Sequence, residues 1–405
     1  MRRHFLALLA TTATAAAGLV LAPAAANAAT PAAPTGLRLA NSPAGTYLTW
    51  SAASGATGFQ VQQATDGLFR QNVRTYSDRD GRDHQLTPIA LAKGRTYYWR
   101  IRAMSGSTAS HWTTAVHAAV ASRELPVRIA SYNVVENSAD GTFESGTRIA
   151  PWSQRVSGVV SLLRQSGAGI VALQEAAGWV ARVRGPRQAD DVATRLGSNW
   201  RVAVTEVLPS QPGYFRTGVY VLYDDNRYRA IASGGHWNIG NTRWSAYQLL
   251  QDRASGARFL VTSAHEATGN GTSADTTRET ETKNLIADAS AYARAHGSVP
   301  VIYAGDFNSN DGHTHVFDGP GVATRAAHIA DAFKSGASRV NARFNSANLY
   351  LRTPPADGRS IDRIFAPAGV GVASWRLTID LSNGRFVGVI PSDHNPIAAD
   401  LTLPY

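Results

Sequence analysis

Cysteine is absent from this chain of 405 residues. Its absence excludes disulfides, thiolate zinc sites and cysteine nucleophiles, so the fold must rely on its apolar cores. Charge is also sparse, since 17% of the residues are charged and 44% are apolar. These proportions are ordinary for a globular protein and give no sign of overall disorder, and the length predicts one to three domains.

Long apolar runs are missing except near the N-terminus. There Arg2 and Arg3 precede the apolar and small residues of 5–21, and Ala26-Asn27-Ala28 fits a small-x-small cleavage site. The run is short and no stop-transfer charges follow it, which argues against a retained anchor helix. We therefore expect a signal peptide over residues 1–28 and a secreted, extracellular protein.

Basic residues outnumber acidic ones, 39 against 29, for a formal net charge of +10. Residues 1–28 contain two arginines and no acid, so the remainder carries +8. Residues 31–122 contain nine basic and four acidic residues and so hold +5 of that charge. A positive surface favours polyanions such as nucleic acid, teichoic acid or an anionic membrane, although basic composition also serves solubility.

Residues 31–122 contain short runs that alternate between apolar and polar side chains. The clearest is 96–103, where Tyr97, Trp99, Ile101 and Ala103 lie on one face and Tyr98, Arg100 and Arg102 on the other. Further runs at 34–39, 47–50 and 58–63 precede it. Period-two alternation with short connections predicts an all-β, immunoglobulin-like sandwich with one face of each sheet buried.

The order of these elements resembles a fibronectin type III domain over most of residues 31–122. Trp50 lies early in the second strand, a Leu-rich turn ends at Gly94, and Tyr97 is similar to a tyrosine corner. We expect Trp50 and Trp99 to belong to the core rather than to bind sugars. The basic charge makes this domain either a spacer or a tether to an acidic extracellular polymer.

From residue 126 to the C-terminus, residue 405, strands and helices mix. The apolar stripe of 152–165 predicts a helix, and so does the pattern of 277–296, which Gly297 ends as a C-cap residue. Strands are expected at 128–132, 169–173, 219–223, 246–251 and 259–263. Because strands predominate and often connect directly, we expect a layered α+β domain.

Polar side chains recur at the ends or starts of these strands. A single carboxylate beside a strand more often forms a turn or a cap than a site. Here the residues recur across the whole domain and include acids, amides and imidazoles, which are the parts of a metal-assisted phosphate-hydrolysis site. They are Asn133, Gln174-Glu175, His265, Asp306, Asn308, Asp362, Asp393 and His394.

The motifs around these residues resemble the endonuclease/exonuclease/phosphatase superfamily, which includes deoxyribonuclease I. The resemblance runs from about residue 127 to the C-terminus, and Gly305-Asp306-Phe307-Asn308 and Ser392-Asp393-His394-Asn395-Pro396 are its most specific parts. It implies a four-layer α/β/β/α sandwich, in which two mixed sheets pack face to face between helices. The site would lie at one edge of that sandwich.

The resemblance also implies a role for each residue. Glu175 is the main ligand of Mg²⁺, with Mn²⁺ or Ca²⁺ as alternatives, and Asn133 and Asp393 complete the metal and phosphate environment. His394 is the general base and Asp362 orients it. Asp306 orients the nucleophile or assists the leaving oxygen. Asn308 and His265 donate to the phosphate. The guanidinium fork of Arg243 suits phosphate, but Arg243 is equally consistent with a surface arginine.

One departure from the family leaves the substrate open. Deoxyribonuclease-I-like members place a glutamate before the strand at 219–223, where it pairs with the first histidine, but residues 214–218 contain no acid here. Glu266 follows His265 directly and would point to the other side of its strand.

We expect a divalent-metal-dependent phosphodiesterase, with an extracellular nuclease acting on nucleic acid first and no obligate protein partner. A sphingomyelinase-type phospholipase C, a phosphomonoesterase and a non-catalytic binding protein are the alternatives. A phospholipase would need exposed apolar residues, and the nearest candidates, Phe344 and Tyr350, fit a core better.

Overall fold

The computed structural model describes residues 30–42, 45–78, 85–86, 91–92, 94–176, 187–203, 218–240, 242–310, 316–367 and 370–405. The predicted signal peptide lies outside these ranges, and so do residues 214–217, where an acid is missing from the sequence. Among the helices within the described ranges, none has the length and apolarity needed to cross a membrane.

The N-terminal β module (residues 31–122) consists of two antiparallel sheets. The smaller sheet contains β1 (Arg38–Ser42), β2 (Gly45–Thr49) and β5 (Gln85–Leu86). The larger sheet contains β4 (Arg74–Asp78), β3 (Gly58–Ala64), β6 (Thr96–Ser105), β7 (Thr108–Ala109) and β8 (Val116–Ala119), of which β7 and β8 both pair with β6.

The alternation predicted for 96–103 is present in β6. Tyr97, Trp99, Ile101 and Ala103 are buried, and their neighbours on the strand are half-buried. Trp50 and Trp99 are 7% and 0% exposed, so both belong to the core, as expected. The Tyr97 hydroxyl accepts a hydrogen bond of 3.0 Å from the backbone N–H of Ala92, which is the kind of contact that a tyrosine corner makes.

The layered domain (residues 124–405) contains two mixed sheets. The first runs in the order β13-β14-β12-β9-β24-β23-β21 and the second in the order β15-β17-β18-β19-β22-β20, with β16 also on β17. The first comprises β9 (Glu124–Asn133), β12 (Ile170–Gln174), β13 (Trp200–Val202), β14 (Tyr220–Asp224), β21 (Ser338–Val340), β23 (Gly371–Leu377) and β24 (Ile397–Pro404). The second comprises β15 (Tyr228–Ala230), β16 (Gly235–Gly240), β17 (Arg243–Asp252), β18 (Arg258–His265), β19 (Val301–Asp306), β20 (Ile329–Asp331) and β22 (Asp362–Pro367).

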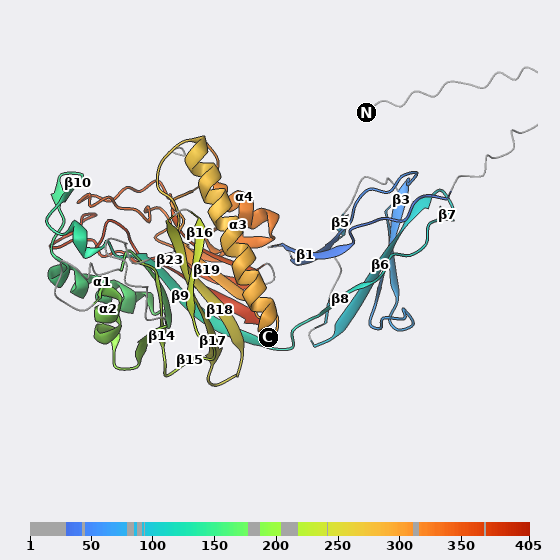
Figure 1. The fold of residues 1–405 in the computed structure, drawn as a ribbon, viewed down its shortest axis with the longest axis horizontal. Helices are drawn as coiled ribbons and strands as arrows, with labels where there is room; N and C mark the ends of the chain where they lie inside the picture. Colours follow the sequence, from blue (N-terminus) through green and yellow to red (C-terminus); the bar gives the residue numbers. More distant parts are fainter. Residues whose placement is uncertain are drawn as a thin grey trace, which may run out of the picture.

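Helices cover the outer faces of both sheets, so the predicted four layers are present. One core lies between the sheets, a second lies between the first sheet and α1 and α2, and a third lies under α3. Figure 1 shows α3 on the side of the sheets away from α1 and α2. The helices are α1 (Trp152–Ser166), α2 (Gln188–Leu196), α3 (Thr272–Ala295), α4 (Gly319–Ala326) and α5 (Ala332–Ser335), and the short elements are η1 (Asn137–Ala139), β10 (Phe143–Glu144) and β11 (Thr147–Arg148).

Helix α3 begins five residues before its predicted start. The extra turn contains Asp275, a buried carboxylate that accepts hydrogen bonds from the backbone N–H groups of Val316 and Phe317 at 2.8 and 3.2 Å. Those contacts come from a distant segment, so apolar periodicity could not reveal them. Gly297 follows the helix with φ of 94°, as its predicted capping role requires.

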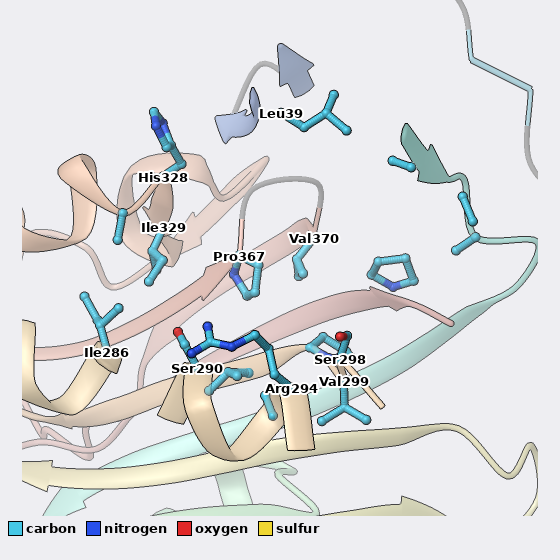
Figure 2. A pocket seen from close by; sticks show the side chains of 18 of the residues that line it. Leu39, Ile286, Ser290, Arg294, Ser298, Val299, His328, Ile329, Pro367 and Val370 are labelled. Atoms are coloured by element: carbon cyan, nitrogen blue, oxygen red, sulfur yellow. The ribbon is translucent and has the colours of Figure 1, made fainter. Parts of the chain in front are cut away.

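Several strands have one end near the β module and the other at the opposite end of the layered domain. Near the module, a cleft of about 790 Å³ is lined by residues such as Val301, Pro367 and Pro404. Figure 2 shows Leu39 of the module across this cleft from Pro367 and Val370. The same strands, β19, β22 and β24, have the predicted site residues at their other ends, so this cleft is not the predicted site.

Candidate active site

Strand register brings the predicted residues to one edge of the sandwich. In the first sheet Asn133 pairs with Gln174, the residue before Glu175. In the second sheet Asp306 pairs with both His265 and Asp362. The two groups meet where the Asn133 Nδ2 atom donates to Asp306 Oδ2 at 3.1 Å, so a hydrogen bond joins the sheets within the site.

Asn133 holds Glu175 in place. Its Nδ2 atom donates to Glu175 Oε1 at 2.9 Å, and its Oδ1 atom accepts from the backbone N–H of Val135 at 3.1 Å. A backbone N–H can only donate, so this contact fixes which way the amide faces. In this arrangement Asn133 orients Glu175, and its own oxygen is turned away from the carboxylates.

Glu175 has a backbone conformation that is unusual for its residue type. Its φ is 52°, and Asn308 has a φ of 48°. Each left-handed non-glycine residue costs of order 1–3 kcal/mol, and such residues cluster at functional sites. Glu175 directly follows β12. Its side chain is about one third exposed, whereas its neighbours Asn133 and Asp306 are buried.

His394 and Asp362 form a short, buried polar contact within the site. His394 Nδ1 lies 2.7 Å from Asp362 Oδ2, and both side chains are buried. Burial disfavours the imidazolium, but the carboxylates of Asp362, Asp393 and Asp306 outweigh it and raise the pKa of His394 well above its usual value. His394 Nε2 lies 3.8 Å from Asp306 Oδ2 and faces the site. A base and its orienting acid make contacts of this kind.

The loop that carries His394 is held by the first sheet and by a neighbouring loop. Ser392 Oγ donates to the backbone oxygen of Asn133 at 2.7 Å, and the backbone N–H of His394 donates to Ser392 Oγ at 3.1 Å. Asn348 Nδ2 donates to the backbone oxygen of Ser392 and to Asn395 Oδ1, at 3.0 and 3.2 Å. The buried Asn348 was not among the predicted residues.

His265 and Arg243 lie together on the other side of the site. Arg243 Nη1 is 3.4 Å from His265 Nε2, and a guanidinium can only donate, so the neutral imidazole carries its proton on Nδ1. Burial, together with the charges of Arg243 and His394, lowers the pKa of His265 to about 4 against the pull of Asp306. His265 is therefore neutral at pH 7, and Arg243 lies at the site beside it.

Asp306 and Asn308 form a compact turn after β19. Asp306 Oδ1 accepts from the backbone N–H of Asn308 at 2.9 Å, and Asn308 Nδ2 donates to the backbone oxygen of Glu266 at 3.0 Å. One Nδ2 hydrogen of Asn308 remains for a ligand. The side chain of Glu266 accepts from Thr282 Oγ1 in α3, at 2.6 Å, so it points away from His265 as expected.

Glu144 is a site residue that the sequence did not predict. Its carboxyl shares a hydrogen bond with Asp393, and burial together with the charge of Asp393 raises its pKa to about 7. Burial, with the charges of Glu175 and Asp306, also raises the pKa of Asp393 to about 6. Glu144 lies on the two-residue strand β10, which is too short for periodicity to detect, and only the turn residues around it hinted at a hairpin.

The donor set fits a hard divalent cation. The charges of Glu175, Asp393 and Glu144 act on one another, and the raised pKa values of the last two reflect a surplus of negative charge that a cation would offset. Among the described residues, the group with close ligand atoms is a different one, in which one ligand atom each of Asp306, Asp362 and His394 lies within 4.8 Å of the others. Ligation by Asp362 there would compete with its 2.7 Å hydrogen bond to His394, so we favour the Glu175 side.

The charge of Glu144 gives a stability prediction. Because its folded pKa of about 7 exceeds the ordinary value of 4.5, the folded state loses stability as pH rises through that interval. In chelator, Glu144→Gln should raise the Tm at pH 8 by a few degrees, and the difference should shrink at pH 5. Calorimetry checks this against Glu279→Gln, a control whose carboxylate is half-buried and pairs with Lys283 on α3. A lower Tm for Glu144→Gln at pH 8 would contradict the assignment.

Known structures share the fold of the layered domain. A Bacteroides thetaiotaomicron protein of the endonuclease/exonuclease/phosphatase family is 16% identical, with a TM-score of 0.54, over 69% of this chain and 96% of its own. A Bacteroides vulgatus member is 19% identical, with a TM-score of 0.53, over 69% and 99%. A mannosyl-6-phosphatase of Bacteroides thetaiotaomicron is 18% identical, with a TM-score of 0.53, over 68% and 99%.

A comparison with curated proteins gave no match. The sequence model of the endonuclease/exonuclease/phosphatase family, whose members are typically hydrolases of phosphoester bonds and commonly use divalent metals, matches residues 130–394. That range holds all nine predicted site residues and most of the layered domain, and the chain belongs to this family.

Proposed function

We propose that the protein is a secreted, divalent-metal-dependent phosphodiesterase, and that its substrate is nucleic acid. The observation that carries the hydrolytic part is the buried contact of 2.7 Å between His394 and Asp362, which faces a group of carboxylates across the site. A histidine held by an acid, beside oxygen ligands for a hard cation, suits the attack of water on a phosphodiester.

Each side chain contributes a defined part to this chemistry. Glu175, with Asp393 and Glu144, would hold Mg²⁺, Mn²⁺ or Ca²⁺, which offsets the charge of the phosphate when bound. Asp362 fixes the imidazole of His394. Once the charge of the surrounding carboxylates is offset, the raised pKa of His394 falls, the ring can take a proton from water, and Asp362 stabilises the imidazolium that forms. Asp306 lies 3.8 Å from Nε2 of both histidines and can orient the water between them.

The opposite side of the site binds the phosphate. Arg243 and the free amide hydrogen of Asn308 can donate to its oxygens, and neutral His265 holds the Arg243 guanidinium in place through Nε2. Donors from Arg243 and Asn308 on one side and carboxylates on the other match a phosphoryl group that is approached by water. These contacts belong to the site's own residues. They select a phosphoester, and they do not select which alcohol the phosphate is esterified to.

Nucleic acid is favoured over other phosphodiesters by charge and by the predicted export. The chain without residues 1–28 carries a net charge of +8, which attracts long polyanions. A panel assay tests the proposal. The protein without its predicted signal peptide is offered supercoiled DNA, single-stranded DNA, RNA, sphingomyelin and mannose 6-phosphate, each with Mg²⁺ and with EDTA. We expect Mg²⁺-dependent cleavage of nucleic acid; hydrolysis of the lipid or the phosphomonoester alone would overturn the choice of substrate.

A lipid phosphodiester is the second candidate because apolar side chains are exposed near the site. Phe143 beside Glu144 is 71% exposed, and Leu349, Val387 and Val389 are 44%, 73% and 42% exposed. Their loops share a small core that contains Ile149, Tyr350 and Phe386. Exposed apolar loops beside a site suit a membrane surface, whereas Phe344 and Tyr350, the sequence's nearest candidates, are buried.

The β module is proposed as a fibronectin type III-like tether to a polyanion rather than as part of the site. Its cleft with the layered domain lies at the other ends of β19, β22 and β24. Deletion of residues 29–122 should therefore leave kcat/KM for a small chromogenic diester within about threefold of the intact value, as expected for a distant and independent part. Circular dichroism serves as the folding control. Loss of hydrolysis by a folded remainder would show that the module is needed for the site.

A further inference from the structure

The outward face of the larger sheet in the β module carries a stack of alternating arginines and aromatic rings. The guanidinium of Arg100 lies 4.1 Å from the ring centre of Phe69 and 4.8 Å from that of Trp112. The guanidinium of Arg102 lies 4.5 Å from the ring centre of Trp112. We call Phe69, Arg100, Trp112 and Arg102 the arginine ladder. Favourable cation–π contacts occur about once per 70–80 residues, so three on one face are a concentration.

Glutamines on the neighbouring strand fix the orientation of both guanidinium groups. Arg100 donates from Nε and Nη2 to Gln62 Oε1 at 2.9 and 2.7 Å. Arg102 donates in the same way to Gln60 Oε1 at 2.9 and 2.6 Å. Each pair is directly opposite in the register of β3 and β6. The planar groups are therefore held before any ligand arrives, which lowers the entropy cost of binding.

The positive charge of the ladder is not neutralised. Within the described part of the chain, neither Arg100 nor Arg102 pairs with a carboxylate, and Nη1 of each has no acceptor. Two like charges two residues apart on one strand, about 7 Å, are costly without an anion nearby. The free N–H groups of both forks can donate to a row of anionic oxygens at that spacing.

We propose that the arginine ladder binds a single strand of nucleic acid through successive phosphates. Successive phosphates of a duplex strand rise by about 3.4 Å along the helix axis. The phosphates of an extended single strand are not held to that rise and can match a spacing of about 7 Å. Single-strand sites combine a positive track with aromatic rings and arginine in this way. The inference rests on the proposed function, because a module that holds the substrate raises its concentration at a site on the same chain.

The test measures binding separately from catalysis. The full chain in EDTA is titrated with a fluorescent oligothymidylate, and anisotropy gives Kd over a range of KCl concentrations. Arg100→Gln/Arg102→Gln is compared with Arg74→Gln/Arg229→Gln, which removes the same charge from exposed positions off the ladder. Arg229 also donates to a glutamine on the neighbouring strand, Gln251, but it stacks on no aromatic ring within the described residues. It is therefore a close match to the ladder arginines.

The ladder variant should weaken binding about tenfold and lower the slope of log Kd against log salt by about 1.4, which corresponds to two phosphates on a single strand. The control should change both values much less. Arg100→Lys/Arg102→Lys keeps the charge without the fork and should lie between them, which guards against misfolding of the glutamine variant. Hydrolysis of a small diester with Mg²⁺ should be the same in all forms.

Three outcomes would overturn the proposal: equal losses in ladder and control variants, a loss of Tm with unchanged binding, or tighter ladder-dependent binding of polyglutamate or heparin than of DNA. The second outcome would mean that the ladder only stabilises the sheet, and the third that its partner is a different acidic polymer. Failure of the wild-type chain to hydrolyse any diester would reject the proposed function while leaving the binding comparison valid.

Discussion

Replacement of His394 by asparagine is expected to lower kcat/KM for phosphodiester hydrolysis by about 10²–10⁴-fold, the usual contribution of a general base. Asparagine keeps a donor near Asp362, so the buried carboxylate is not left alone. The loss should fall mainly on kcat, because His394 faces the water rather than the phosphate donors. Steady-state kinetics with a small chromogenic diester measures this.

The variant His394→Ala measures what His394 contributes to stability as well as to catalysis. The imidazole is buried and bonds Asp362 Oδ2, while Asp362 Oδ1 has no hydrogen-bond partner within the described residues. Removal of the ring therefore leaves a buried charge, and we expect a stability cost of about 1–3 kcal/mol that a sequence-based view of a loop residue would miss. If His394→Asn and His394→Ala both keep wild-type activity, His394 is not the base.

Replacement of Glu175 by glutamine should reduce activity by at least about 10³-fold, because several kcal/mol of transition-state charge stabilisation would be lost with the cation. Glutamine can still accept the hydrogen bond from Asn133, so the loop should keep its shape. EDTA should have the same effect on the wild-type chain, and Mg²⁺ or Mn²⁺ should restore only the wild type.

A binding readout distinguishes loss of the cation from other causes. Isothermal titration of the chelated chain with Mn²⁺ should show a site that Glu175→Gln weakens at least about tenfold, while Glu279→Gln binds as the wild type does. Full activity of the wild type in chelator would reject the metal role. Unchanged Mn²⁺ affinity in Glu175→Gln would instead move the cation to the Asp306, Asp362 and His394 group.

Much of the layered domain could be predicted because its signals are local. The buried stripe of α1, the apolar runs of β9, β12 and β18, and the polar residues at their ends are all visible in the sequence. Strands whose ends meet at one edge then bring Asn133, Glu175 and Asp306 together.

The parts that sequence did not show depend on contacts between distant segments. Glu144 reaches the site on a two-residue strand, and its role depends on Asp393, far along the chain. The orientation of the Asn133 amide depends on a single hydrogen bond from Val135. Arg100 and Arg102 were visible as an outward pair, but their alignment with Trp112 depends on where the chain beyond β7 crosses the sheet.

We propose that water activated by the His394–Asp362 pair hydrolyses the phosphodiester bonds of nucleic acid. The most direct measurement is the cleavage of one end-labelled single-stranded DNA with Mg²⁺ by the wild-type chain and by His394→Asn, side by side. We expect cleavage by the wild type and a rate at least about 10²-fold lower for the variant. Equal cleavage by both, or none by a wild-type chain that hydrolyses a lipid or a phosphomonoester, would contradict it.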